Sequence, residues 1–132
     1  MPVTYEIDAN SRRIRTRCVG AITFAEVIGH FTTLEHDPTV PSSLDVLLDL
    51  TETTAPPDPE QLRSVAAEIG RLKSRIEWGA CAMVVEREEL FGLSRMFQVF
   101  VERSFKRSQV FRNHADAEAW LDEVSVARGN HE

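Results

Sequence analysis

The stretch Asp45-Val46-Leu47-Leu48-Asp49-Leu50 decides the fold of this chain. Four of its six residues are apolar and the run is too short for a helix, so we expect a strand that is buried on both faces at the centre of a parallel sheet. A second apolar run, residues 79–85, predicts a neighbouring strand for the same reason. A long helical pattern separates the two runs, and a strand, a helix and a second strand in this order form a parallel crossover unit. The sequence therefore predicts the α/β class.

The composition is typical of one soluble, folded domain. The chain has 132 residues, of which 42% are hydrophobic and 27% are charged, and its formal net charge is -6. Scattered basic residues that are outnumbered by acidic ones argue against nucleic acid as a partner. Neither a signal-peptide pattern nor an apolar run of about eighteen residues occurs, which predicts a cytoplasmic protein without a transmembrane segment. Cys18 and Cys81 lie in apolar strand patterns without Cys-x-x-Cys spacing, so we expect free, buried thiols.

Two alternating segments near the N-terminus, residues 3–8 and 13–19, predict an antiparallel hairpin. With the turn centred on Asn10 and Ser11, one face collects opposite charges and the other face collects mainly apolar pairs. The charged face carries three arginines, which are Arg13, Arg15 and Arg17. These side chains could bind an anion, but we favour a solvated face that the hairpin's own carboxylates neutralise.

Capping patterns place the first two helices. Thr23 and Glu26 form a Thr-x-x-Glu pattern, and the helix that they open should end before Pro38. Asp58 is the expected N-cap of the next helix, with Pro59 at its first position.

Two further helices are expected over residues 89–103 and 113–124, separated by a short strand at 109–111. Residues 1–124 should form a single domain, and the polar residues 125–132 a flexible tail. On a helical wheel of the segment 89–103, Phe91 and Val99 project off the core face. Either they contact a partner or ligand, or a neighbouring loop or helix covers them.

Five segments carry a resemblance to a known family, namely residues 1–8, 46–50, 91–97, 110–113 and 119–121. Together with the order of the elements, they resemble the SpoIIAA-like superfamily, which includes the STAS domains of anti-sigma-factor antagonists and is similar in fold to CRAL-TRIO lipid-binding domains. They are similar to small bacterial STAS-like proteins of unknown function. The resemblance implies a hairpin followed by parallel strands in sequential order, with four helices mainly on one face of the sheet.

One face of such a sheet is short of cover. Right-handed crossovers that always add the next strand on the same side place the connecting helices on one face. Leu47, Cys81 and Met83, or their neighbours, would then point toward the other face. A terminal helix, the hairpin or a second subunit must cover these side chains. We predict a homodimer on this ground.

The STAS resemblance implies a phosphorylatable serine at the start of the helix that follows the central strand. This chain has Pro57-Asp58-Pro59-Glu60 at that place, without a serine at the cap. Three threonines lie just upstream, which are Thr51, Thr53 and Thr54. They could accept phosphate near a helix N-terminus, although we favour turn hydroxyls that bond local backbone. The CRAL-TRIO resemblance implies a lipid pocket, but the chain lacks the extra helices that gate such a pocket.

An enzyme would need its reacting groups at the carboxyl edge of the parallel strands, where open α/β sheets bind ligands. The side chains expected at that edge could hold a small polar molecule, and they include Thr51, Glu86, Arg112 and His114. The chain has no glycine-rich phosphate loop, no Gly-x-Ser-x-Gly motif and no histidine pair at metal-ligand spacing. We therefore predict no catalytic activity, no cofactor and no metal site.

The resulting functional prediction is a non-enzymatic cytoplasmic module that acts by binding an unknown regulatory protein. The alternative is a carrier of a small apolar or amphipathic ligand, held between the sheet and the helix at 89–103. The candidate ligand-binding or partner-binding residues are Thr51, Thr53, Thr54, Asp58, Glu86, Phe91, Arg95, Val99, Arg112 and His114.

Overall fold

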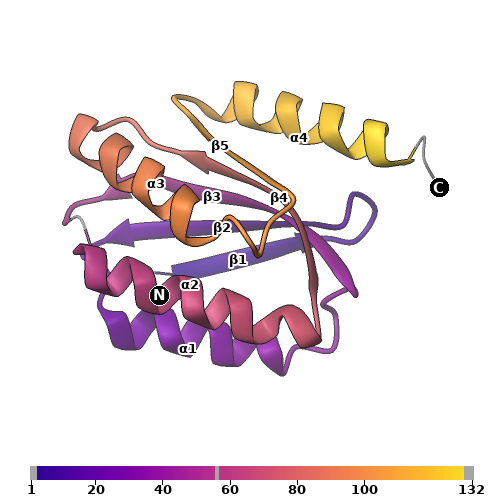
Figure 1. Ribbon diagram of the computed structural model, residues 1–132, viewed down its shortest axis with the longest axis horizontal. Coiled ribbons are helices and arrows are strands. Elements are labelled where there is room, and N and C mark those ends of the chain that lie inside the picture. Colours follow the sequence, from indigo (N-terminus) through magenta and orange to yellow (C-terminus); the bar gives the residue numbers. More distant parts are fainter. Residues whose placement is uncertain (1–2, 56, 130–132) are drawn as a thin grey trace.

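Five strands form one sheet in chain order, β1-β2-β3-β4-β5 (Figure 1). The computed structural model describes residues 3–55 and 57–129. The strands are β1 (Val3–Asp8), β2 (Arg13–Gly20), β3 (Ser43–Thr53), β4 (Glu77–Val84) and β5 (Arg107–Phe111). β1 pairs with β2 in antiparallel fashion and every later pair is parallel, which confirms the predicted order of strands.

Three helices cover one face of the sheet and the fourth lies on the other face (Figure 1). The helices are α1 (Phe24–Glu35), α2 (Pro59–Arg71), α3 (Glu88–Phe100) and α4 (His114–Gly129), with a short 3-10 helix, η1 (Leu72–Ser74), after α2. α4 continues past Val124, so helical backbone extends into the predicted tail, whose residues 130–132 lie outside the described residues. In the part of the chain that the structure describes, no helix is long and apolar enough to cross a membrane.

The local patterns fold as predicted. β1 and β2 pair in the expected register, with Tyr5 opposite Thr16. Both side chains lie on the face of the sheet that points toward α1, α2 and α3. Thr23 caps α1 and Asp58 caps α2, each in a capping box with the residue three positions later. The free backbone donors at the start of both helices are therefore satisfied by side chains close in sequence.

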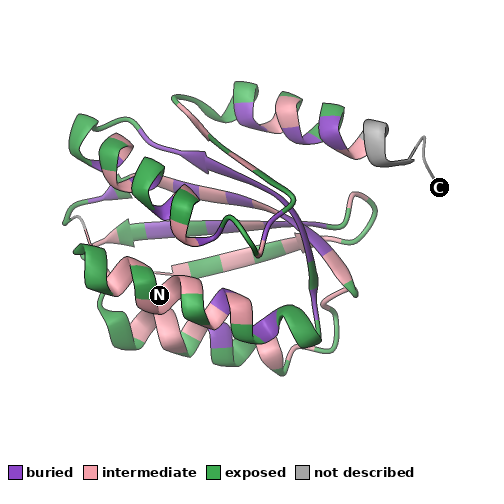
Figure 2. Ribbon diagram, in the orientation of Figure 1, coloured by how far each residue is buried: buried purple, intermediate pink, exposed green. Residues whose placement is uncertain are grey.

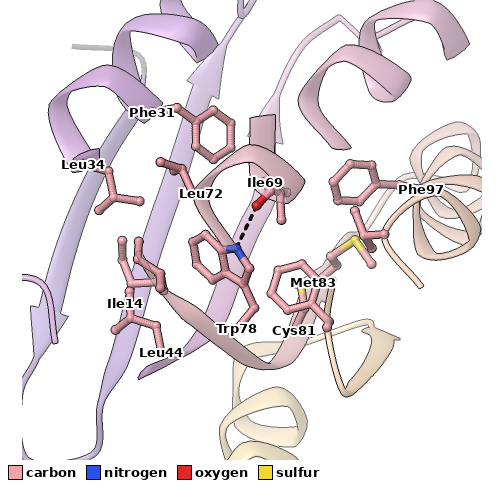
Figure 3. Packing of buried hydrophobic residues seen from close by; sticks show 13 residues of the cluster. Ile14, Phe31, Leu34, Leu44, Ile69, Leu72, Trp78, Cys81, Met83 and Phe97 are labelled. Atoms are coloured by element: carbon pink, nitrogen blue, oxygen red, sulfur yellow. Dashed lines mark hydrogen bonds between the residues drawn. The ribbon is translucent and has the colours of Figure 1, made fainter. Parts of the chain in front are cut away.

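The larger hydrophobic core lies between the sheet and the helices α1 to α3 (Figure 3). Trp78 lies inside it, and its indole Nε1 donates to the carbonyl oxygen of Ile69 at 2.9 Å. Cys81 and Met83 point into the same core. Of the side chains expected on the other side of the sheet, Cys81 and Met83 therefore do not lie there, whereas Leu47 and the neighbours Ala80, Ala82 and Val84 do.

A register shift explains where these β4 side chains point. The pairing of β3 with β4 moves from Leu44 opposite Trp78 to Val46 opposite Cys81, so β4 contains one extra residue here. An extra residue reverses the alternation of side chains beyond it. Cys81 consequently shares the face of Trp78, which simple alternation between them would not allow.

α4 covers the other face of the sheet. The smaller core on that side contains Leu47, Ala80, Ala82, Val84, Ala117, Leu121 and Val124. β4 is buried along nearly its whole length because it has a helix on each side (Figure 2). Of the three possible covers, a terminal helix is the one present over β3, β4 and β5. The reason for expecting a second subunit is thus removed for these strands, and the homodimer stays a prediction.

Ion pairs fasten α4 to β2. Arg13 is only 2% exposed, and its two terminal nitrogens bind Glu118 at 2.7 Å and Asp122 at 2.9 Å. Arg15 binds Glu118 as well, at 2.9 Å, and Arg17 pairs with a carboxylate of β3. The predicted solvated face, neutralised by the hairpin itself, is therefore wrong for Arg13, because α4 buries this side chain and supplies its carboxylates.

Candidate ligand-binding site

The centre of the sheet is not fully covered on the face that points toward α1, α2 and α3. Val46, Leu48 and Leu50 of β3 are only half-buried, and so are Leu62 and Val65 on the opposing side of α2. A cavity of about 180 Å³ lies between them and accounts for this exposure. The prediction of a strand buried on both faces is therefore wrong for the face of β3 that points toward α2, whereas the β3 residues that face α4 are buried.

The cavity has a floor, a roof and two side walls. β2, β3 and β4 form the floor, and α2 forms the roof with residues such as Val65. α1 contributes one wall through Val27 and Phe31, and α3 contributes the other through Leu93 and Phe97. Leu93 and Phe97, on the inner side of α3, thus line the cavity.

The cavity opens at the carboxyl ends of β2 and β3. The lining there includes Thr23, Phe24 and Ala55, which are exposed to solvent. Trp78 and Phe105, at the far end of the lining, are buried. The opening therefore lies at the edge where open α/β sheets bind ligands.

The lining is almost wholly apolar and carries no charge at neutral pH. Among the described residues, no Asp, Glu, Lys or Arg side chain lines the cavity. Burial lowers the pKa of His30 to about 4, so its imidazole is neutral. Burial also raises the pKa of Cys81 to about 12 and, together with the charge of Asp49, the pKa of Cys18 to about 11. Both thiols are free, as predicted, and remain protonated.

Two of the predicted site residues, Thr51 and His114, meet at an aspartate on the α4 side of the sheet. Asp49 Oδ1 accepts from the backbone nitrogen of Thr51 at 2.9 Å and from its hydroxyl at 2.7 Å. His114 Nε2 donates to Asp49 Oδ2 at 2.9 Å. Burial raises the pKa of Asp49, but these hydrogen bonds outweigh it and hold the pKa below its ordinary value. Asp49 is not among the predicted site residues, although an acidic residue inside an apolar strand could have indicated it.

The other candidates near the carboxyl edge lie apart from one another. Thr53 lines the cavity, and its hydroxyl donates to the carbonyl oxygen of Leu50 at 2.7 Å. Asp58 accepts from a backbone nitrogen of α2 at 2.8 Å as its N-cap. Thr54 and Glu86 are exposed. Among the described residues, Thr53 is thus the one predicted site residue that the structure places on the cavity.

The remaining candidates lie on the outer surface of α3 and beside it. The guanidinium carbon of Arg112 lies 4.4 Å from the ring centre of Phe91, and that of Arg95 lies 6.0 Å from it. Val99 is 66% exposed, one turn beyond the exposed Met96. We call these residues (Phe91, Arg95, Met96, Val99 and Arg112) the outer α3 surface.

The sequential sheet with crossover helices on one face is the arrangement of the SpoIIAA-like fold, and a solved structure supports this. The crystal structure of an uncharacterized protein from the DUF3478 family of Shewanella loihica PV-4, described as having a SpoIIAA-like fold, matches with a TM-score of 0.60. The two chains share 17% sequence identity, and the match covers 90% of this chain and 91% of the other. No protein-family model and no curated protein matches the sequence. The likeness therefore shows the fold.

Proposed function

We propose that this protein binds a small amphipathic molecule in the cavity between its sheet and the helices α1 to α3. The observation that supports the proposal is the uncharged cavity of about 180 Å³, with its opening at the carboxyl edge of the sheet. An apolar protein cavity of roughly 150 Å³ is known to bind benzene. The part of the ligand that enters the cavity should thus have about the size of a substituted benzene ring.

The energetics of an empty cavity favour an occupant. The apolar side chains that line this open cavity are left in contact with water, and a ligand gains about 25 cal/mol for each Å² of apolar surface that its binding removes from water. Because such a ligand binds the folded protein, binding and stability should rise together.

A valine-to-phenylalanine exchange tests the proposal. Val65 lines the cavity from α2, whereas Val99 is exposed on α3 and serves as the matched control. We expect toluene to bind the unmodified protein in calorimetric or NMR titrations and to raise its Tm. Val65→Phe should abolish both effects and Val99→Phe should preserve both. Failure of both toluene and benzyl alcohol to bind the unmodified protein would refute the proposal.

The outer α3 surface supports a second candidate function, which is contact with a protein partner. Exposed apolar side chains at Met96 and Val99 lie beside two arginines that flank Phe91. α3 also lines the cavity with its inner side, so ligand binding and partner contact would share one helix. A regulatory protein and a second copy of this chain are both candidate partners, and the free buried thiols are in keeping with a cytoplasmic setting.

Sedimentation of the purified protein distinguishes the two partners. A concentration-dependent dimer that Val99→Glu disrupts, at an unchanged Tm, would support contact between two copies. A monomer at every concentration would exclude the homodimer and leave a different protein as the partner to be sought.

A further inference from the structure

Buried polar side chains in this protein generally have partners. Trp78 donates to Ile69, the carboxylate of Asp45 accepts from the backbone nitrogen of Ala80, and the hydroxyl of Thr53 donates to a carbonyl oxygen. This is the normal behaviour of folded proteins, because an unpaired buried polar group loses its hydrogen bonds to water without compensation.

Among the described residues, Ser11 Oγ and Arg13 Nε are fully buried without a partner, and neither residue lines the cavity. Two hydroxyl groups in the cavity lining also lack a hydrogen bond. Thr16, on β2, is 5% exposed and Ser94, on α3, is 4% exposed. Within the described part of the chain neither hydroxyl forms a side-chain hydrogen bond, although Thr32 and Ser64 on neighbouring helices bond the preceding turn. Both hydroxyls therefore face the cavity with their hydrogen-bonding capacity unused.

His30, on the α1 wall, adds a third polar group on the side of the cavity where Thr16 lies in the floor. Its ring lies 5.4 Å from the ring of Tyr5, and Tyr5 is the cross-strand partner of Thr16. Burial keeps the imidazole neutral, so it offers one donor and one acceptor. Tyr5 itself is occupied, because its hydroxyl donates to Asp37 at 2.5 Å. Unlike Tyr5, His30 and Thr16 have no side-chain hydrogen bond within the described residues and remain available to a ligand.

We propose that the ligand carries an uncharged oxygen group, a hydroxyl or a carbonyl, which binds inside the cavity either to Thr16 of the floor and His30 of the α1 wall or to Ser94 of the α3 wall. The proposal rests on the proposed function and specifies its ligand class. Hydroxyl and imidazole groups can complement such an oxygen as donors and as acceptors. The apolar remainder of the lining would hold the rest of the ligand.

The same lining discriminates against a carboxylate. A buried anion needs a cation or several donors to replace its hydration, and among the described residues no Lys or Arg lines the cavity. Arg87, near the opening, is engaged by the carbonyl oxygens of Thr53 and Thr54 and by Glu89. An alcohol should consequently enter where the corresponding acid anion does not.

Three probes of one size test this inference, namely toluene, benzyl alcohol and benzoate. At pH 7.5 we expect benzyl alcohol to bind the unmodified protein at least as tightly as toluene, and benzoate to bind at least tenfold more weakly. The double variant Thr16→Val, Ser94→Ala removes both hydroxyls at nearly constant volume. It should weaken benzyl alcohol about tenfold relative to toluene, and His30→Phe should add to the loss.

The outcomes separate the two proposals. If toluene binds and Val65→Phe blocks it, but benzyl alcohol and benzoate bind equally, the cavity is a binding site and the inference about the polar group is overturned. An unchanged ratio of benzyl alcohol to toluene in the double variant would overturn it as well. If no probe binds the unmodified protein, the proposed function itself fails. Tm values of the variants measured without probe report whether each one folds.

Discussion

The ion pairs between β2 and α4 give a stability prediction that differs sharply between two neighbouring carboxylates. Arg13 binds both Glu118 and Asp122, but the Glu118 side chain is 32% exposed and the Asp122 side chain is 70% exposed. We expect Glu118→Gln to lower the free energy of unfolding much more than Asp122→Asn. The more buried carboxylate also holds Arg15, so its loss affects two cations.

The magnitude follows from what each change leaves behind. Leaving a buried charge without its partner costs about 3–5 kcal/mol. Arg13 retains Asp122 in the Glu118→Gln variant, which places the expected loss near the lower limit, at about 3 kcal/mol. Asp122→Asn removes an exposed partner, for which the loss is about 0.2–1 kcal/mol. For a chain of this length 1 kcal/mol corresponds to roughly 3–5 °C in Tm.

Urea unfolding measures the difference directly. Tryptophan fluorescence reports on both cores, because Trp78 lies in the larger core and the ring of Trp120 lies 5.5 Å from that of Phe111 across the contact between α4 and β5. Far-UV circular dichroism reports on the whole fold. Equal losses for Glu118→Gln and Asp122→Asn would refute the reasoning, because they would mean that Arg13 is not buried against α4.

Three further predictions follow from the capping and titration properties of single residues. Asp58→Ala removes the cap of α2 and should lower the free energy of unfolding by about 1 kcal/mol in urea titrations, whereas Asp58→Asn should retain most of it. Burial raises the pKa values of Cys18 and Cys81, so neither thiol should react with a thiol reagent at pH 8 in the folded protein. Both thiols should react in urea, and rapid reaction without urea would contradict their burial. Hydrogen bonds lower the pKa values of Asp49 and Glu118 in the folded state despite their burial. The stabilisation that these carboxylates give is therefore fully present above their unfolded pKa values of about 4 and is lost as the pH falls through their folded pKa values. A Tm that stays constant from pH 6 to pH 3 would contradict this contribution.

Local and nearest-neighbour patterns were the parts of the fold that the sequence predicted. The hairpin register follows from charge and hydrophobic pairing across two adjacent strands, and the capping boxes span only a few residues. The docking of α4 depends on a contact between Arg13 and Glu118, which are 105 positions apart. Alternation in a strand identifies two faces, but it does not state which layer covers each one. The burial of Arg13 was unpredictable for that reason.

The cavity could not be predicted from hydrophobic periodicity, because periodicity reports which side chains face inward and not how closely they approach. Val46, Leu48 and Leu50 have the same pattern whether α2 touches them or stands away. The polar members of the lining are different, since Ser94 falls in the same stripe as Leu90 and Phe97. A hydroxyl at a core position needs a partner, and on a helix the preceding turn usually provides it. Where that local bond is absent and the side chain lines an open space, a molecule that enters the space can supply the missing partner. The polar residues that hydrophobic periodicity assigns to the core are thus the ones on which the proposed ligand class depends.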